Sequence, residues 1–348
     1  MERGILKMSN TSANTWDRSI EFFNQVSLKA KDMYEGLDDF SVKLLDYSEN
    51  ATYLVENPKT NEKFILRVCR PDYHRKEEIE SEVKWLQSID EHTTIMVSKP
   101  ILGSNNEFLQ TVTLEGDSRN YHCVLFTFLE GETPDVDNEE KLIRIFREIG
   151  RTTAQFHQHS ISNYAKFEDI KRPIWDYDNL LGEQPKWGRW QDGRGITPER
   201  EQLLTRVSNT IKSRLEIFGK GPETFGLIHA DLRHANLLID NDKKVVQVID
   251  FDDSGFGWYL YDLATSLSFI EHRSYVPKLI EAWLEGYREV RLLSPKEEKE
   301  IPTFIMMRRL QLIAWIGSRD NETAEELGAE YSVETDNLAI SYLKKFEY

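Results

Sequence analysis

The residues best suited to do chemistry lie in the stretch GLIHADLRHANLLIDNDKKVVQVIDFDDSG, residues 226–255. Asp231, Asn236 and Asp250 stand there among strongly apolar residues, where an unpaired carboxylate is costly. Their charge must therefore be compensated. A metal, a phosphate-bearing ligand held by that metal, or ordinary capping and turn chemistry could each do so.

The two apolar runs in this stretch predict a hairpin. NLLID and VVQVID flank the turn-forming segment NDKK, so two antiparallel strands are expected. If Asp240 pairs with Val245, Asn236 lies next to Asp250 at the open end of the hairpin. Residues that are opposite or diagonal there have Cβ atoms about 5 to 8 Å apart. An amide oxygen and a carboxylate can then converge on one hard cation such as Mg²⁺, while the loop DLRHAN curls Asp231 over the same place.

Such an arrangement supplies what phosphoryl transfer requires. The reaction needs a metal to neutralise the moving phosphate and a separate carboxylate to orient an alcohol and accept its proton. Asn236 and Asp250 would hold Mg²⁺, and Asp231 would be the base. HADLRHAN also fits the kinase spacing of His, Asp, four residues and Asn, with Ala230 where protein kinases usually have Arg.

Other interpretations of these residues remain open. Asp250 could end a strand and Asn236 could cap a turn. His229, Asp231 and His234 could form the metal trio of a hydrolase, because neutral imidazole is a common ligand. No third histidine or water-activating Glu stands at a matching interval, so we favour His229 as a structural residue that braces the loop.

The wider sequence predicts a β-rich part followed by a mainly helical one. Strands are expected at ATYLVEN, KFILRVCR, FLQTVTL and YHCVLFTFL, with a helix at KEEIESEVKWLQSI between the second and the third. After EGETPDV, helical periodicity marks NEEKLIRIFREIGRTTAQFHQH, PEREQLLTRVSNTIKSRLEIF, YVPKLIEAWLEGYREV and PTFIMMRRLQLIAWIGSR. We expect two domains, residues 1–129 and 130–348, with residues 1–35 a helical extension of the first.

The composition excludes several classes of protein. The chain has 348 residues with 39% hydrophobic content, enough for a sizeable core, and its net charge of −16 disfavours binding to nucleic acid or anionic lipid. Cys69 and Cys123 form no repeated spacing that would indicate a disulfide framework or a zinc cluster. The start MERGILKMSN lacks a long apolar core, and the apolar runs are too short to span a membrane. We expect a cytoplasmic protein.

LIHADLRHANLLID, VIDFDD and GWYLYDLATSL resemble the kinase-like phosphotransferases, a family that includes aminoglycoside phosphotransferases, choline kinases, type II homoserine kinases, and bacterial stress-response and spore-coat kinases. The likeness extends more loosely from SENATYLV to Trp315, and IWDYDNLLGEQPKWGRW looks like an insert found in some members. The resemblance implies an α+β, two-lobed protein-kinase-like fold with a β-rich N-terminal lobe and a mainly helical C-terminal lobe. It also implies that Asp231 is the base and that Asn236 and Asp250 bind metal. Asp262 would brace the loop.

The resemblance implies that the first lobe binds the nucleotide, although this sequence departs from the family pattern there. Members usually carry Lys, sometimes Arg, on the third strand to grip the α- and β-phosphates, paired with a Glu on the helix. Here FILRV offers Arg67, and the helix offers Glu82 or Glu78. Arginine keeps its charge and can bind phosphate through two nitrogens. ATP is the expected donor, and GTP remains open.

Two further segments are expected to contact the nucleotide by resemblance. No glycine-rich loop is present, since DYSENATYLV stands in its place, so backbone groups around Ser48 and Asn50 would serve instead. VLFTFLEGETP would be the hinge, where Thr127, Phe128 and Leu129 offer backbone groups to a purine edge. A buried edge strand is the alternative for this segment.

The acceptor is expected to be a small molecule. Only eleven residues separate Asp250 from Asp262, too few for the activation segment and A-P-E motif of ordinary protein kinases. The negative net charge favours an amine-bearing alcohol, so an aminoglycoside, choline, ethanolamine, homoserine or a sugar all stay open. The acidic run NETAEELGAEYSVETD is either an exposed helix and loop or a wall for such a cation.

The leading hypothesis is a kinase that uses ATP and Mg²⁺ to phosphorylate a hydroxyl group. One alternative is a nucleotide-binding scaffold without activity, motivated by the missing glycine loop and by Arg67. A protein Ser/Thr kinase of the stress-response type is another.

Overall fold

The computed structural model describes residues 13–240, 245–319 and 321–347. The chain divides into two compact units, of which the first ends at Leu129 and the second takes in the residues from Glu130 onward. The division has one exception. The segment Ile89–Val97 groups with the second unit, because β4 (Met96–Val97) pairs in parallel with β10 (Val245–Val248).

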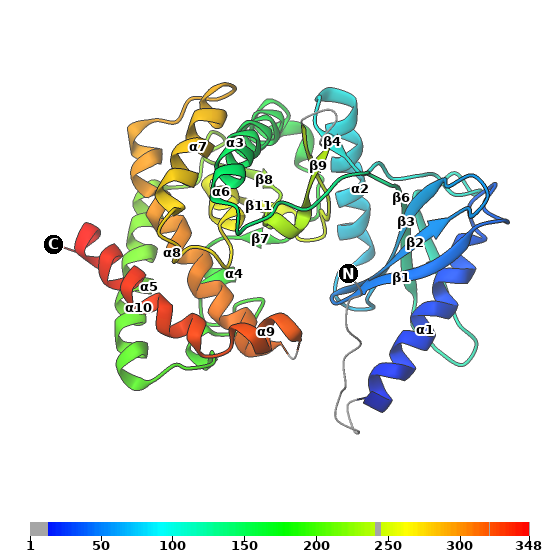
Figure 1. The fold of residues 1–348 in the computed structure, drawn as a ribbon, viewed down its shortest axis with the longest axis horizontal. Helices are drawn as coiled ribbons and strands as arrows, with labels where there is room; N and C mark the ends of the chain where they lie inside the picture. Colours follow the sequence, from blue (N-terminus) through cyan, green and yellow to red (C-terminus); the bar gives the residue numbers. More distant parts are fainter. Residues whose placement is uncertain (1–12, 241–244, 320, 348) are drawn as a thin grey trace. The chain divides into compact units, whose positions relative to one another are not determined.

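The first unit is an antiparallel sheet backed by a helix (Figure 1). Its strands follow the spatial order β1-β2-β3-β6-β5. Helix α1 (Ala13–Lys31) packs Phe23 and Val26 into one apolar core with strand residues such as Tyr53 and Leu125. The strands are β1 (Ser41–Tyr47), β2 (Asn50–Glu56), β3 (Lys63–Cys69), β5 (Leu109–Val112) and β6 (Tyr121–Thr127).

The predicted strands and helix of the first unit are present. β2 and β3 form the expected hairpin, and α2 (Lys76–His92) buries Ile79, Val83 and Leu86 as its periodicity predicted. Strand β1 was not predicted, because its apolar alternation is short: only Val42 and Leu44 alternate toward the core before the register shifts after Leu44. Part of the helical extension predicted over residues 1–35 falls on residues 1–12, outside the described residues.

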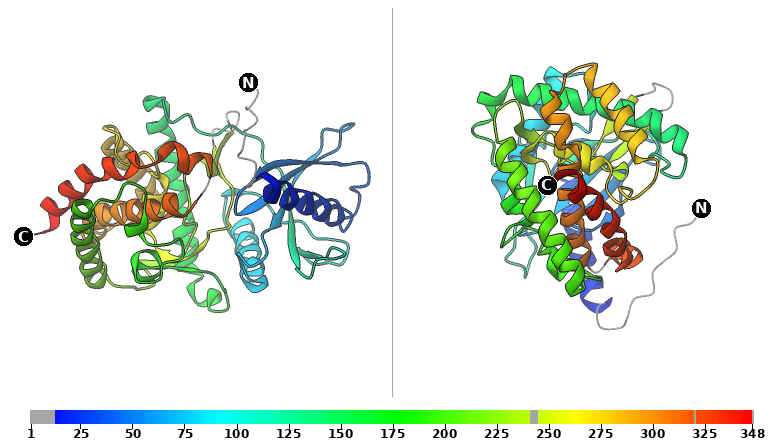
Figure 2. Two further views of the ribbon diagram at one scale, coloured as in Figure 1. Left: turned by 90° about the horizontal axis from the view of Figure 1, so that it is seen from below. Right: turned by 90° about the vertical axis from the view of Figure 1, so that its left-hand side faces the viewer.

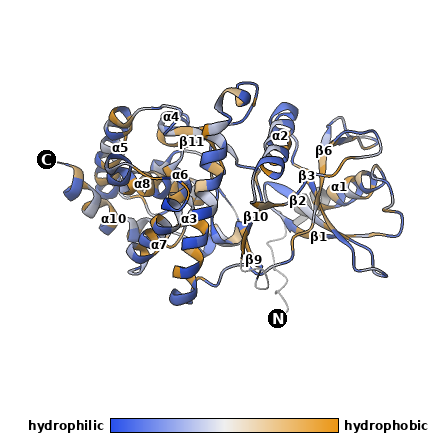
Figure 3. Ribbon diagram, turned by 90° about the horizontal axis from the view of Figure 1, so that it is seen from above, coloured by the Kyte–Doolittle hydropathy of each residue, from blue (hydrophilic) through white to orange (hydrophobic). Residues whose placement is uncertain are grey.

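Two long helices of the second unit pack closely together. α3 (Glu139–Ser162) lies against α7 (Val276–Arg288), and glycines permit the approach. A Cβ on Gly150 would collide with the backbone of Trp283, and one on Gly286 with the backbone of Arg147. Figure 3 shows hydrophilic and hydrophobic residues alternating along α3, as its amphipathic sequence predicted.

Two more predicted helices of the second unit are also present. α5 (Pro198–Phe218) matches its predicted range, while α8 (Pro295–Ser318) begins earlier than predicted. Ser294 and Glu297 form a capping box there, and Pro302 is accommodated inside the helix.

The acidic run near the C-terminus forms α9 (Glu322–Leu327) and part of α10 (Glu330–Phe346). Helix α10 packs against α5 and α8 (Figure 2). Tyr331 and Thr335 are buried, and Asp336 forms an ion pair with Arg200, so this run is packed rather than simply exposed. No helix within the described ranges is long and apolar enough to cross a membrane.

Two small sheets complete the second unit and carry the loops of the candidate site. The predicted hairpin is confirmed, since β9 (Leu237–Asp240) pairs with β10 in the expected register, Asp240 opposite Val245. The other sheet follows the order β7-β11-β8. Its strands are too short and too rich in glycine to show a pattern: β7 (Ile174–Trp175), β8 (Phe225–Ile228) and β11 (Gly255–Trp258).

Candidate active site

The structure brings the predicted catalytic residues together around the mouth of the β9–β10 hairpin. The loop after β8 contains Asp231 and ends in a short 3₁₀ turn, η3 (His234–Asn236), that leads into β9. Asn236 donates from Nδ2 to the backbone oxygen of Asp231 at 2.9 Å and to its Oδ2 at 2.8 Å. The backbone nitrogen of Ile249, next to Asp250, donates to the backbone oxygen of Asn236 at 3.0 Å. The three residues therefore occupy one end of the hairpin.

The side chains at this end fit a hard divalent cation. Because Nδ2 of Asn236 points at Asp231, Oδ1 of Asn236 faces away from Asp231. No described residue donates a hydrogen bond to Oδ1 of Asn236. Asp250 is exposed and adopts a φ of +63°, a conformation that costs energy outside glycine. An amide oxygen and a carboxylate are ligands that Mg²⁺ accepts. Asn236 and Asp250 could therefore hold such an ion.

Asp231 is a buried carboxylate surrounded by donors. Its side chain accepts hydrogen bonds on Oδ2 from Nε of Arg233 at 3.0 Å and on Oδ1 from a terminal nitrogen of Arg308 at 2.6 Å. Burial raises the pKa of the Asp231 carboxyl, but the positive charges of Arg233 and Arg308 outweigh that effect and hold the pKa below its usual value. The group is therefore ionised near neutral pH and can accept a hydrogen bond.

The loop that carries Asp231 is braced by Asp262 on α6 (Leu260–Ser266). Asp262 is fully buried, and its oxygens accept the backbone N–H groups of His229 at 3.1 Å and Ala230 at 2.7 Å. Ala230 has a φ of +66°, so these bonds stabilise a conformation that an alanine rarely adopts. His157 reaches the same carboxylate through Nε2 at 3.2 Å.

His229 uses both of its ring nitrogens on the backbone. Its Nδ1 accepts the N–H of Asp231 at 3.3 Å, and its Nε2 donates to the oxygen of Ile249 at 3.2 Å. A ring held in this way has no nitrogen left for a metal. Among the described residues, no three His, Cys, Asp or Glu side chains cluster as a metal site. The geometry thus gives no support to a hydrolase trio of His229, Asp231 and His234.

In the first unit, Arg67 pairs with Glu82. Two parallel hydrogen bonds of 2.8 Å join the guanidinium to the carboxylate, and both side chains are buried. Glu78, the other candidate, contacts Arg75 and His74 instead. The structure therefore selects Glu82 as the partner, in the strong bidentate geometry that arginine favours.

The segment expected to replace a glycine-rich loop is a tight turn between β1 and β2. Ser48 donates its backbone N–H to the oxygen of Asn50 at 3.0 Å. Asn50 is buried, and its side chain accepts the N–H of Arg70 at 3.2 Å. The polar atoms of Asn50 thus fix the turn to the neighbouring strand.

The predicted hinge segment divides at the end of β6. Thr127 belongs to the strand and exchanges hydrogen bonds with Lys99, donating its backbone N–H at 2.9 Å and accepting on Oγ1 at 2.9 Å. Phe128 and Leu129 follow the strand and are half-buried. Thr127 therefore ends a strand, but β6 lies between β3 and β5 and is not the edge strand of the alternative.

The tryptophan-rich stretch is largely core. Trp175, Trp187 and Trp190 are buried, and the rings of the first two lie 5.5 Å apart. The stretch forms β7, a short helix α4 (Tyr177–Leu181) and a 3₁₀ turn, η2 (Trp190–Asp192). Trp187 also lies 5.8 Å from the guanidinium of Arg308, so this packing extends to the surroundings of Asp231.

Three contacts of the candidate site were not predicted. Arg308 and the pairing of His157 with Asp262 join residues far apart in the sequence, whereas Arg233 lies inside the motif itself. One signal was available for Arg308. Two arginines interrupt the apolar helical run FIMMRRLQLIAWI, and charges buried in such a run require partners.

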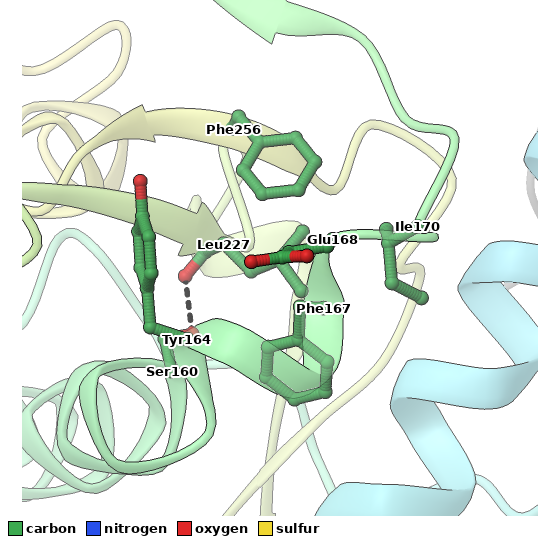
Figure 4. A pocket seen from close by; sticks show the side chains of 7 residues that line it. All are labelled: Ser160, Tyr164, Phe167, Glu168, Ile170, Leu227 and Phe256. Carbon is green, nitrogen blue, oxygen red and sulfur yellow. Dashed lines mark hydrogen bonds between the residues drawn. The ribbon is translucent and has the colours of Figure 1, made fainter.

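A cavity of about 150 Å³ lies in another part of the second unit, at the end of α3 beside the β8–β11 sheet (Figure 4). The rings of Tyr164 and Phe256 flank the carboxylate of Glu168 there. Its other lining residues are Ser160, Phe167, Ile170 and Leu227. None of the predicted site residues lines this cavity, so the cavity is not part of the candidate active site.

Comparisons with known proteins point to one family. Residues 43–293 match the phosphotransferase enzyme family. Amicoumacin kinase from Bacillus subtilis (strain 168) is 25% identical over 295 residues, which cover 82% of each chain. The structure of a microcompartment-associated aminopropanol kinase is 37% identical with a TM-score of 0.81, and the match covers 92% of this chain and 97% of that one. Amicoumacin kinase hAmiN, solved with AMP-PNP, Ca²⁺ and Ami, shares the fold at 18% identity and a TM-score of 0.72, over 92% of this chain and 96% of its own.

The fold and the matched range both include the candidate site. A β-rich first unit and a mainly helical second unit are the parts of a protein-kinase-like fold, as predicted. The matched range contains Arg67 and Glu82 as well as Asp231, Asn236 and Asp250. The chain belongs to the phosphotransferase enzyme family.

Proposed function

We propose that this protein is a kinase that transfers the γ-phosphate of ATP to the hydroxyl group of a small amino alcohol. Asp231 is the base, and Asn236 and Asp250 are the residues that would hold Mg²⁺. The observation that carries the proposal lies at the mouth of one hairpin, where an ionised, buried carboxylate accepts from an amide whose own oxygen receives no hydrogen bond from the described residues.

The chemistry follows from the groups at this site. The acceptor hydroxyl donates a hydrogen bond to the carboxylate of Asp231, which takes its proton as the oxygen forms a bond to the γ-phosphorus. The bond between that phosphorus and the bridging oxygen breaks, and ADP leaves. A divalent ion bound at Asn236 and Asp250 would neutralise charge on the phosphate oxygens. Arg233, 3.0 Å from Asp231, adds a positive charge to the same surroundings.

The nucleotide contacts proposed for the first unit rest on Arg67. Glu82 holds the guanidinium through both terminal nitrogens and so orients it. An oriented arginine suits the α- and β-phosphates, because its charge is permanent and its donors are directional. Backbone groups near Ser48 and Asn50 would contact the phosphates. Those of Thr127, Phe128 and Leu129 would contact the purine.

The acceptor class is supported by two observations. The aminopropanol kinase is 37% identical to this chain along nearly the whole length of both. The net charge of −16 also favours encounter with a cationic molecule over an anionic one. A small alcohol that carries a protonated amine meets both conditions.

The test is a screen of acceptors with purified protein, Mg²⁺ and ATP, read as ADP release. The panel contains aminopropanol, ethanolamine, choline, homoserine and an aminoglycoside, each beside a neutral alcohol of similar size. We expect the highest kcat/KM with a small amino alcohol and no transfer by Asp231→Asn. Binding of Mg·ATP without transfer to any acceptor would instead favour the inactive scaffold, and equal turnover in Asp231→Asn would remove Asp231 from the mechanism.

A further inference from the structure

Arg308 is a charged residue buried in the middle of α8. Its side chain is 2% exposed although its neighbours in the helix are mainly apolar. A buried arginine requires a partner for its charge and its donors. Arg308 donates from Nε to Ser268 at 2.9 Å, and from its terminal nitrogens to Gln311 at 3.2 Å and to Asp231 at 2.6 Å. The charge partner is therefore the proposed base.

The hydrogen bonds of Asp231 limit where an acceptor can bind. A carboxylate offers about two acceptor directions on each oxygen. Oδ2 already accepts from Arg233 and from Asn236, whereas Oδ1 accepts from Arg308 alone among the described residues. One direction on Oδ1 therefore remains for a hydroxyl group, and it lies beside the guanidinium of Arg308.

We propose that Arg308 is a positioning residue for phosphoryl transfer, which fixes the rotation of the Asp231 carboxylate and leaves one place on Oδ1 for the acceptor hydroxyl. This inference rests on the proposed function, because it assigns Asp231 as the base. Proton transfer and in-line attack both depend on that orientation, and a displacement of about 1 Å in such a site can cost 100-fold in rate.

Arg308 can act in this way because its own position is fixed. Gln311, one turn further along α8, holds the guanidinium and also accepts a hydrogen bond from Tyr261. Ser268 ties Arg308 to the segment after α6, and Thr265 in that helix accepts the N–H of Leu232 from the catalytic loop at 3.0 Å. One short segment thus holds both the loop and the arginine that contacts its carboxylate.

The next residue of α8 provides a matched control. Arg309 is also buried, and it donates to Glu271 at 2.9 Å and to Thr335 at 2.7 Å. The second oxygen of Glu271 accepts from Tyr331 at 3.0 Å. This pair touches none of the proposed site residues, so its loss should affect the stability of the fold and not the orientation of Asp231.

The experiment compares Arg308→Lys and Arg308→Ala with Arg309→Lys and Arg309→Ala. We expect kcat per folded enzyme to fall by about 10- to 100-fold in the Arg308 variants, with the Kd for ATP close to that of the wild type. The Arg309 variants should unfold at lower urea concentration but keep their kcat. Guanidine at low millimolar concentration should restore part of kcat in Arg308→Ala and none in Arg309→Ala, because only the first vacates a guanidinium site beside the base.

Wild-type kcat in the folded Arg308 variants would overturn the proposal, as would equal losses in the two pairs. If Arg308→Ala does not fold, Arg308→Lys decides, since a lysine keeps the charge but not the directional donors. An inactive Asp231→Asn beside fully active Arg308 variants rejects this inference alone. An active Asp231→Asn rejects the proposed function as well.

Discussion

Two buried arginine–carboxylate pairs, one in each unit, differ in how the oxygens of the carboxylate are used. In the first unit, Arg67 occupies both oxygens of Glu82 with hydrogen bonds of 2.8 Å. In the second, the donors around Asp231 leave one direction on Oδ1 unused among the described residues. The carboxylate orients the arginine in the first pair, whereas the arginine orients the carboxylate in the second.

Under the proposed function, this difference predicts distinct kinetic roles for the two units. A guanidinium supported by Glu82 is suited to bind a ligand that arrives already charged, such as the phosphates of a nucleotide. A carboxylate held in place by Arg308 is suited to accept a proton during the reaction. Changes near Arg67 should therefore alter nucleotide affinity, and changes near Asp231 should alter kcat.

Apart from loss of the proposed base itself, the largest effect is expected at the proposed metal ligand of the second unit. Asp250→Ala removes an exposed carboxylate that would hold Mg²⁺, so kcat at saturating ATP should fall by about 1,000-fold while the fold is retained. Asp240→Ala, at the other end of the same hairpin, is the control. ADP release across a range of Mg²⁺ concentrations measures both variants, and an unchanged kcat in Asp250→Ala would remove this residue from the site.

A smaller effect, on affinity and not on kcat, is expected in the first unit. Arg67→Met should weaken ATP binding by about 10- to 100-fold, the value of a charge-assisted bidentate contact. Arg75→Met is the control, since Arg75 pairs with Glu78 in the same unit. Titration calorimetry with a non-hydrolysable ATP analogue measures both. If Arg67→Met instead lowered kcat at unchanged affinity, the division of roles between the units would be wrong.

Loss of the brace on the catalytic loop should have a moderate effect. Asp262→Asn replaces a carboxylate that accepts the N–H groups of His229 and Ala230, so one donor would face the amide NH₂ group. We expect the free energy of unfolding to fall by about 2 kcal/mol and kcat by about 10-fold. Urea unfolding and steady-state kinetics measure the two quantities. Full activity together with full stability would show that the loop does not need this brace.

The smallest effect concerns the pH dependence of stability. Complete burial lowers the pKa of His157, and this outweighs the opposite influence of Asp262. The unfolded chain then binds a proton at this residue near about pH 6.5, above the pKa in the folded state. The contribution of His157 to the free energy of unfolding is therefore fully present above about pH 6.5. It is lost as the pH falls through the lower pKa of the folded state.

Urea unfolding at about pH 7.5 and about pH 5.5 tests this expectation. The wild type should lose more stability on acidification than His157→Gln does. Equal losses in the two proteins would mean that His157 is not protonated on unfolding in this range.

The loop of the candidate site could be predicted from the sequence because its information is local. The spacing within the motif placed Asp231 and Asn236 in one loop. The register of the β9–β10 hairpin then placed Asp250 beside Asn236. The sequence did not identify Arg308, which is 77 residues away from Asp231 and reaches it only through the packing of α8. Pairing across that distance depends on tertiary structure, which periodicity does not report.

The first unit shows the same limit. The resemblance offered Glu82 and Glu78 equally, because the two residues lie one turn apart on the same helix. Only the direction of each side chain shows which of them pairs with Arg67. Strand β1 was missed because only Val42 and Leu44 alternate toward the core before a register shift interrupts the strand. The long helices α3, α5, α7 and most of α8 were predictable, since apolar residues recur at helical spacing over a dozen residues or more in each.

The most direct test of the account is the product formed from ATP and aminopropanol, followed by ³¹P NMR with wild type and Asp231→Asn. We predict a phosphate ester on the hydroxyl oxygen with the wild type. Asp231→Asn should still bind ATP, with its rate of ester formation lowered by about 1,000-fold or more. A phosphate on nitrogen, or ester formation at the wild-type rate without the Asp231 carboxylate, would contradict the assignment of Asp231 as the base.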